Sequence, residues 1–232
     1  MKKISLVALA AVTFAATSAL AAAGDLYMGL SAGYQMVPGK VKGITGGNAE
    51  KEVSGSPKGF NMVGSFGYMV SDEFRTALAF QYIFDQKKKL DDADVVGASG
   101  VDNLEMKSAK SWNVMAHFYY DFLNSSSFTP FVGAGVGYGS REYGINTGSK
   151  IDAAVITQED LDKSKKTNKG FVFAGTLGAA YKMSDSVALE VAYMFQSLPK
   201  AETKQENVSG SNIKIKGKNL AHNIMAGVRF AF

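Results

Sequence analysis

The 232-residue chain contains no cysteine, two histidines and four prolines. Without cysteine it can form no disulfide bond and has no thiol nucleophile, and two histidines supply few ligands for a zinc site. We therefore expect no metal and no other cofactor. The 25 lysines and arginines nearly balance the 21 aspartates and glutamates, and both signs are interspersed along the chain. Because nucleic-acid-binding domains concentrate positive charge, we expect no nucleic-acid partner.

Long apolar runs are also missing, except at the N-terminus. Two lysines at positions 2 and 3 precede the apolar run Ile4–Ala16, and small residues follow at Ala21–Ala23. This order is typical of a bacterial secretory signal peptide. We predict a signal peptide over residues 1–23 and a mature domain over residues 24–232. Beyond the signal, no apolar run reaches the roughly 18 residues of a membrane-spanning helix, so a spanning domain must use strands.

The mature domain has a two-residue apolar period, which is typical of β-strands. From Leu26 to Met36 every second residue is apolar, and mostly small or polar residues stand between them. The same alternation recurs in seven further segments, at residues 60–70, 74–84, 112–122, 128–138, 171–181, 187–195 and 220–232. The pattern predicts an all-β fold of eight strands.

The connections between these segments alternate in length. Short turns lie at residues 71–73, 123–127 and 184–186. Long polar segments lie between them, at about residues 38–57, 86–109, 140–169 and 199–218. Short turns on one side and long loops on the other are typical of an antiparallel up-and-down transmembrane β-barrel. We expect a barrel in the lipid of a bacterial outer membrane, with extracellular loops and periplasmic termini.

The two faces of the predicted strands differ in a way that favours a membrane barrel. Aromatic residues stand at both ends of the apolar series, as lipid interfaces favour. Polar residues stand on the opposite face, and an eight-stranded barrel leaves an interior that side chains just fill. We expect them to form an interior polar plug, with a gate as the alternative role. The plug residues that we single out are Arg75, His117, Asp121, Lys182, Glu190 and Arg229.

The histidines do not suggest catalysis. His117 and Asp121 lie four residues apart on one face of a strand. At about 3.3 Å per residue they are roughly 13 Å apart, too far for a hydrogen-bonded pair. His222 belongs to the apolar face, and its strand contains no serine. We predict no catalytic residues and no enzymatic activity.

Lysines gather in the third and fourth long segments. Such lysines could bind anionic lipopolysaccharide or sulfated glycans, and a merely solvated loop surface is the alternative. The lysines of this predicted basic patch are Lys163, Lys165, Lys166, Lys169, Lys214, Lys216 and Lys218. The segment from Ile213 to Lys218 also alternates, so it can extend the last strand beyond the membrane.

Two parts of the chain carry a resemblance to known proteins. The segment Ala226–Phe232 resembles the C-terminal signature of bacterial outer-membrane barrels, which implies that the barrel-assembly machinery reads Phe232. The hairpin formed by Ala116–Phe122 and Phe128–Gly137 resembles that of opacity-type porins and rickettsial surface antigens, such as the Wolbachia surface protein and the Anaplasma major surface proteins. The resemblance implies a surface antigen or adhesin whose loops contact host surface proteins or glycans. A small-solute porin and a structural envelope protein are the alternatives.

Overall fold

The structure is a computed structural model that describes residues 23–45, 49–55, 58–84, 86–90, 104–147, 166–199, 202–208, 211–217 and 220–232. Of the predicted signal peptide, all but Ala23 lies outside the described residues. In the part of the chain that the structure describes, no helix is long and apolar enough to cross a membrane.

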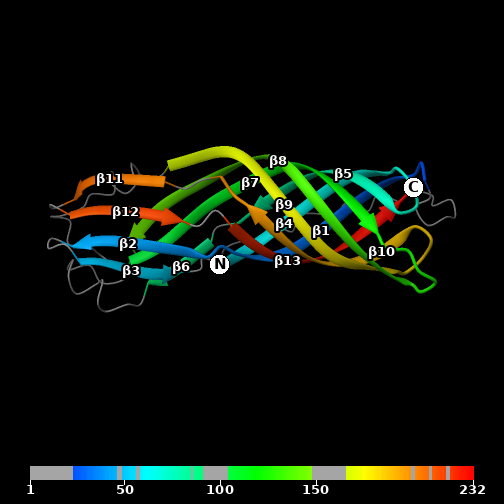
Figure 1. Cartoon of the computed structure of the whole chain (residues 1–232), viewed down its shortest axis with the longest axis horizontal. Coiled ribbons are helices and arrows are strands. Elements are labelled where there is room, and N and C mark those ends of the chain that lie inside the picture. Colours follow the sequence, from blue (N-terminus) through cyan, green and yellow to red (C-terminus); the bar gives the residue numbers. More distant parts are fainter. Residues whose placement is uncertain are drawn as a thin grey trace, which may run out of the picture.

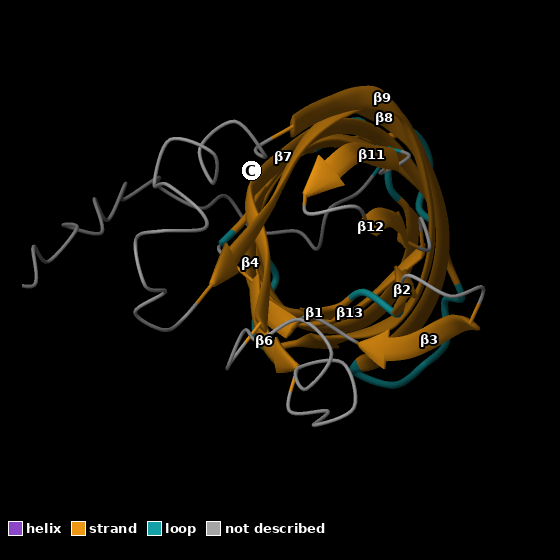
Figure 2. Cartoon of the chain, turned by 90° about the vertical axis from the view of Figure 1, so that its left-hand side faces the viewer, coloured by secondary structure: helices purple, strands orange, loops and turns teal. Residues whose placement is uncertain are grey.

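Eight strands form a closed antiparallel barrel, as the alternation predicts (Figures 1 and 2). Closure follows from β1, which pairs with β4 on one side and with β13 on the other. The other neighbours along the ring are paired in chain order. The barrel strands are β1 (Leu26–Met36), β4 (Lys58–Met69), β5 (Phe74–Ile83), β7 (Leu104–Asp121), β8 (Phe128–Thr147), β9 (Lys166–Lys182), β10 (Val187–Ser197) and β13 (Leu220–Ala231).

A second sheet stands at the long-loop end of the barrel, at the left of Figure 1. Its strand order is β11-β12-β2-β3, so the hairpin between β1 and β4 pairs with the hairpin between β10 and β13. The predicted loops 38–57 and 199–218 therefore contain paired strands. These strands are β2 (Gly39–Thr45), β3 (Ala49–Gly55), β11 (Glu202–Val208) and β12 (Ser211–Gly217).

Strands also extend into the other two predicted loops. Within 86–109, β6 (Gln86–Leu90) pairs with the beginning of β7, which starts at Leu104. Within 140–169, β8 continues to Thr147 and pairs with β9 from Lys166 onward. These extensions carry polar residues at successive positions, so the two-residue apolar period does not mark them.

The apolar series faces outward. Phe60 and Phe171 are 69% and 72% exposed, whereas their inward neighbours Asn61 and Val172 are almost completely buried. Large apolar side chains with this exposure fit a lipid-facing surface. Aromatic residues form a row at each end of this surface. The long-loop row contains Tyr34, Phe60, Phe84, Trp112, Tyr138, Phe171 and Phe195, and the short-turn row contains Tyr68, Phe74, Phe122, Phe128, Tyr181 and Phe232.

The short turns are held by local side-chain hydrogen bonds. Between β7 and β8, the Asn124 side-chain amide donates to the Phe128 carbonyl over 2.9 Å, and the Ser126 backbone amide donates to Asn124 Oδ1 over 2.8 Å. Between β4 and β5, Ser71 Oγ accepts from the Phe74 amide over 3.0 Å. Asn and Ser stabilise turns because their side chains satisfy nearby backbone groups.

The outward apolar face predicts the effect of a charge placed there. Leu78 lies midway along β5 and is 61% exposed. We expect Leu78→Arg to lower the free energy of unfolding in lipid vesicles by about 2–4 kcal/mol, the cost of a cation near the bilayer midplane. Urea unfolding followed by the fluorescence of Trp112, the single tryptophan, measures this change.

The control is Ser125→Arg in an exposed short turn, which we expect to change the unfolding free energy by less than about 0.5 kcal/mol. Equal effects of the two substitutions would contradict a lipid-facing outer surface.

Candidate functional site

Four predicted plug residues form a charged layer inside the barrel, near the short-turn end. Arg75 Nε lies 3.0 Å from both carboxylate oxygens of Asp121. Arg75 Nη2 lies 3.5 Å from Glu190 Oε1, and Arg229 Nε lies 3.2 Å from the same oxygen. Arg229 Nη1 lies 3.6 Å from Asp121 Oδ2. Each arginine thus contacts both carboxylates, and the charges of this layer cancel.

Aromatic rings surround the charged layer. The guanidinium carbon of Arg75 lies 4.2 Å from the centre of the Tyr119 ring and 4.7 Å from that of Phe131. The guanidinium carbons of Arg75 and Arg229 both lie 5.8 Å from the centre of the Tyr27 ring. Cation–π attraction adds to the ion pairs in such a desolvated place. The rings and the ion pairs together fill the lumen at this level.

A second polar layer crosses the barrel toward the long-loop end, and it consists of side-chain amides. Asn223 Oδ1 accepts from Gln35 Nε2 over 3.0 Å and from Asn61 Nδ2 over 3.1 Å. Gln81 Oε1 accepts from the side-chain amide of Asn113 over 2.6 Å and from that of Gln196 over 3.1 Å. All members are 3% exposed or less. This amide layer contains Gln35, Asn61, Gln81, Asn113, Gln196 and Asn223.

The residues singled out for the plug are charged residues and histidine, and all six belong to the inward polar series that the alternation of the strands indicates. Five residues of the amide layer belong to the same series, namely Asn61, Gln81, Asn113, Gln196 and Asn223. The sequence does not show that the amides and the charged residues separate into two layers, because that depends on the register between strands.

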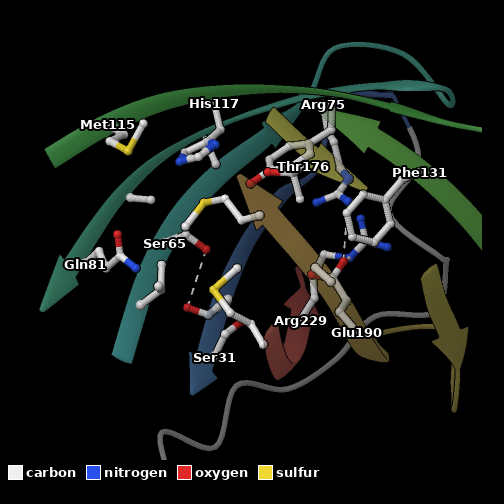
Figure 3. Close-up of a pocket in the computed structure, with 18 of the residues that line it drawn as sticks. Ser31, Ser65, Arg75, Gln81, Met115, His117, Phe131, Thr176, Glu190 and Arg229 are labelled. Atoms are coloured by element: carbon white, nitrogen blue, oxygen red, sulfur yellow. Dashed lines mark hydrogen bonds and ion pairs between the residues drawn. The ribbon is translucent and has the colours of Figure 1, made fainter. Parts of the chain in front are cut away.

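A cavity of about 60 Å³ lies between the two layers (Figure 3). It is lined by residues of both layers and by Ser31, Ser65, His117 and Thr176. This volume exceeds the roughly 10–15 Å³ that a cavity needs to hold one water molecule. Six of the lining residues have a buried side-chain atom without a hydrogen-bond partner within the protein, and two of these atoms are His117 Nδ1 and Thr176 Oγ1. The cavity is therefore small, lies in the lumen and has both polar and apolar walls.

The other two predicted plug residues lie outside the charged layer. His117 lines the cavity and stacks on Tyr119, with ring centres 5.6 Å apart and an 8° angle between the planes. Its ring lies over Gly135, where a Cβ atom would stand only 2.7 Å from His117 Nδ1. Lys182 is partly exposed beside a short turn, with Nζ 3.0 Å from Asp185 Oδ1. It thus takes part in a separate surface ion pair.

The lysines of the predicted basic patch are distributed over different elements. Lys163, Lys165 and Lys218 lie outside the described residues. Lys166 and Lys169 belong to β9, where Lys169 is exposed and pairs in register with Ser140 of β8. Lys214 and Lys216 belong to β12 in the second sheet. The described members are therefore divided between two sheets.

The described residues contain no group of three or more His, Asp or Glu side chains that could hold a metal ion. His222 is half-buried, and its Nδ1 atom forms a hydrogen bond with the hydroxyl of Tyr193 on the neighbouring strand. Inside the barrel, ion pairs dominate one layer and side-chain amide hydrogen bonds dominate the other. Each layer also contains buried polar atoms without a hydrogen-bond partner in the protein, such as Glu190 Oε1 and Gln196 Oε1.

Residues 7–231 match the family model described as the outer membrane protein beta-barrel domain. The chain belongs to this family of outer-membrane barrels. The family is described by its barrel and its membrane, not by a catalysed reaction.

Relatives and solved structures agree with this assignment. The chain is 25% identical to the outer membrane protein PagN of Salmonella typhimurium over 207 residues, covering 86% of this chain and 78% of PagN. It is 28% identical to a protein of Rickettsia felis named "Putative adhesin" over 237 residues, covering 99% of each.

Among solved structures, Neisserial surface protein A has a TM-score of 0.51 at 18% identity, covering 89% of this chain and 97% of its own. OprG of Pseudomonas aeruginosa has a TM-score of 0.52 at 14% identity, covering 92% of this chain and 99% of OprG. These two likenesses support the fold alone.

The burial of the charged layer predicts that its ion pairs contribute much more to the free energy of unfolding than the surface ion pair of Lys182 does. We expect Asp121→Ala to lower the free energy of unfolding by about 3–5 kcal/mol, because it leaves two buried arginines with one carboxylate. Lys182→Ala, which removes a partly exposed pair, should cost less than about 1 kcal/mol. Urea unfolding in lipid vesicles measures both values. An Asp121→Ala protein as stable as Lys182→Ala would show that the charged layer does not stabilise the barrel.

Proposed function

We propose that the chain is a surface adhesin, whose barrel anchors long hairpins that contact host surface proteins or glycans. The observation that carries the proposal is the contrast between the two parts of the molecule. The lumen is filled by two polar layers around a small cavity, whereas the paired hairpins continue beyond the barrel as a sheet (Figure 1). An interior of this kind favours a role for the outer surface over passage of solutes.

The relatives support the same proposal. One is an outer-membrane protein of Salmonella typhimurium, and another, which this chain covers almost end to end, is the Rickettsia felis protein named "Putative adhesin". The narrower likeness to the Wolbachia and Anaplasma surface antigens stays a prediction from the resemblance of the central hairpin. A rigid barrel that presents long connections is a common scaffold for recognition, because loops vary while the strands stay.

The orientation is part of the proposal. Residues 1–23 direct export, the short turns and both ends of the mature domain face the periplasm, and the four long segments face outward. Phe232 pairs with Leu26 through two backbone hydrogen bonds of 2.9 and 3.2 Å, next to the last barrel strand. We assign to Phe232 the additional role of the signal that the barrel-assembly machinery reads.

Removing the second sheet tests the proposal. Residues 39–55 and 202–217 are each replaced by a short turn. The altered protein is expressed in a bacterium that otherwise does not adhere, and the bacteria bound to cultured host cells are counted. We expect most of the adhesion to be lost while the barrel still folds, because the replaced residues lie outside the barrel strands.

The matched control replaces residues 124–126, in a short turn at the opposite end, and should adhere like the unmodified protein. Because the chain has no cysteine, a single Ser211→Cys substitution and an impermeant maleimide report whether the hairpin is displayed on intact cells. If bacteria that display the barrel without the hairpins adhere as well as bacteria that display the full chain, the adhesin proposal is wrong.

A further inference from the structure

The pairing of β2 with β12 brings together lysines that are about 170 residues apart in the chain. Lys40 stands directly opposite Lys216, and Lys42 stands directly opposite Lys214. We call these four residues the lysine quartet. Only its β12 half belongs to the basic patch predicted from the sequence, because nothing in the sequence shows that these two hairpins pair.

The register places the whole lysine quartet on one face of the second sheet. Directly opposed residues of antiparallel strands share a face, and so do residues two apart along a strand. Neighbouring strands are about 5 Å apart and alternate residues about 7 Å apart, so the four Cα positions form a compact rectangle. The same two rows continue to β11 and β3, with Lys204 and Glu52 at the ends of one and Glu202 and Ser54 at the ends of the other.

The opposite face of the sheet is nearly free of charge. The row between the two lysine rows carries Thr203, Ile215, Val41 and Val53, in register order across the four strands. The next row contains one charged residue, Lys51. The lysines are thus segregated on one face instead of being spread over both.

Electrostatics favours an anionic partner for this face. Like charges directly opposite each other destabilise an antiparallel strand pair, and here two such pairs are adjacent. Glu50, Glu52 and Glu202 share this face with the quartet and Lys204, so five lysines stand against three glutamates and the face keeps a positive excess. A partner with repeating negative groups relieves both like-charge pairs at once. Lysine suits this role because its ammonium is a compact charge with three donors, which does not need the planar geometry that arginine imposes.

The position of the face indicates which anion it meets. Tyr34 belongs to the aromatic row at the long-loop end, and Lys40 and Lys42 follow it by six and eight residues. At about 3.3 Å per residue the chain spans at most roughly 20–26 Å from Tyr34 to these two lysines. Even with a strand tilt of about 40°, this reaches beyond a headgroup layer of about 5–8 Å. Figure 1 shows β2 and β12 extending away from the barrel. This distance favours a soluble chain over the headgroups of the surrounding membrane.

We propose that the lysine quartet binds a linear sulfated polysaccharide. The proposal rests on the adhesin function and names the chemistry of its ligand. Single-stranded nucleic acid is the less suitable polyanion, because none of the positions that the register places on this face is an aromatic residue on which bases could stack.

The test compares two variants that lose the same charge. K40Q/K42Q/K214Q/K216Q removes the quartet, and K87Q/K88Q/K89Q/K169Q removes four lysines of β6 and β9. The full chain in detergent micelles is titrated with a size-defined heparin oligosaccharide, and the shift in electrophoretic mobility on heating verifies that each variant is folded. We expect the quartet variant to bind about tenfold more weakly or worse, and the control variant to change by less than about twofold.

Equal weakening of both variants would overturn the proposal, because it would show attraction to net charge alone. So would equal binding of the desulfated oligosaccharide, or quartet-dependent binding to lipopolysaccharide vesicles or an acidic protein without binding to heparin. The adhesion assay separates this proposal from the function on which it rests. If the quartet variant adheres fully and the hairpin replacement does not, the function stands and the ligand is wrong; if both adhere fully, both proposals fail.

Discussion

Hydrocarbon offers no hydrogen-bond partner to a backbone amide or carbonyl, so a sheet inside a membrane must leave no open edge. The whole architecture of this chain depends on that requirement. β1 meets it by pairing with both β4 and β13, and Leu26 and Phe232 exchange backbone hydrogen bonds where the ends of the barrel meet. Beyond the aromatic row, the described strands include a four-stranded open sheet whose outer strands are β11 and β3, and there water can satisfy the backbone.

Closure with eight strands leaves an interior too narrow for a water-filled channel, and its side chains must satisfy one another. The chain brings polar side chains together at two levels, with ion pairs at one and amide hydrogen bonds at the other. Arg75, Asp121, Glu190 and Arg229 neutralise one another near the short turns, while amides pair near the long hairpins. An interior occupied in this way agrees with the proposal that recognition belongs to the hairpins outside the barrel.

The barrel could be predicted from the sequence because lipid imposes a strict two-residue period. The alternation of Leu26–Met36 already indicates which side chains face outward, and the same rule places Arg75 and Asp121 inside. Their contact could not be predicted, because it depends on the register between strands. The pairing of β2 with β12 could not be predicted from the sequence for the same reason. Beyond the membrane no apolar face marks a strand, and the two paired segments are far apart in the chain. Lys182 was placed inside by its parity alone, yet it lies at a strand end where its amine reaches a turn carboxylate.

The central claim is that the two polar layers close the lumen, so that the molecule acts through its surface. Ionic current through the refolded full chain in a planar lipid bilayer tests it most directly, beside an Arg229→Ala variant that opens the charged layer and leaves the amide layer intact. The account predicts no discrete channel openings for either protein. Stable unitary conductance of the unmodified chain, altered in the Arg229→Ala variant, would contradict it and make the charged layer the gate of a pore.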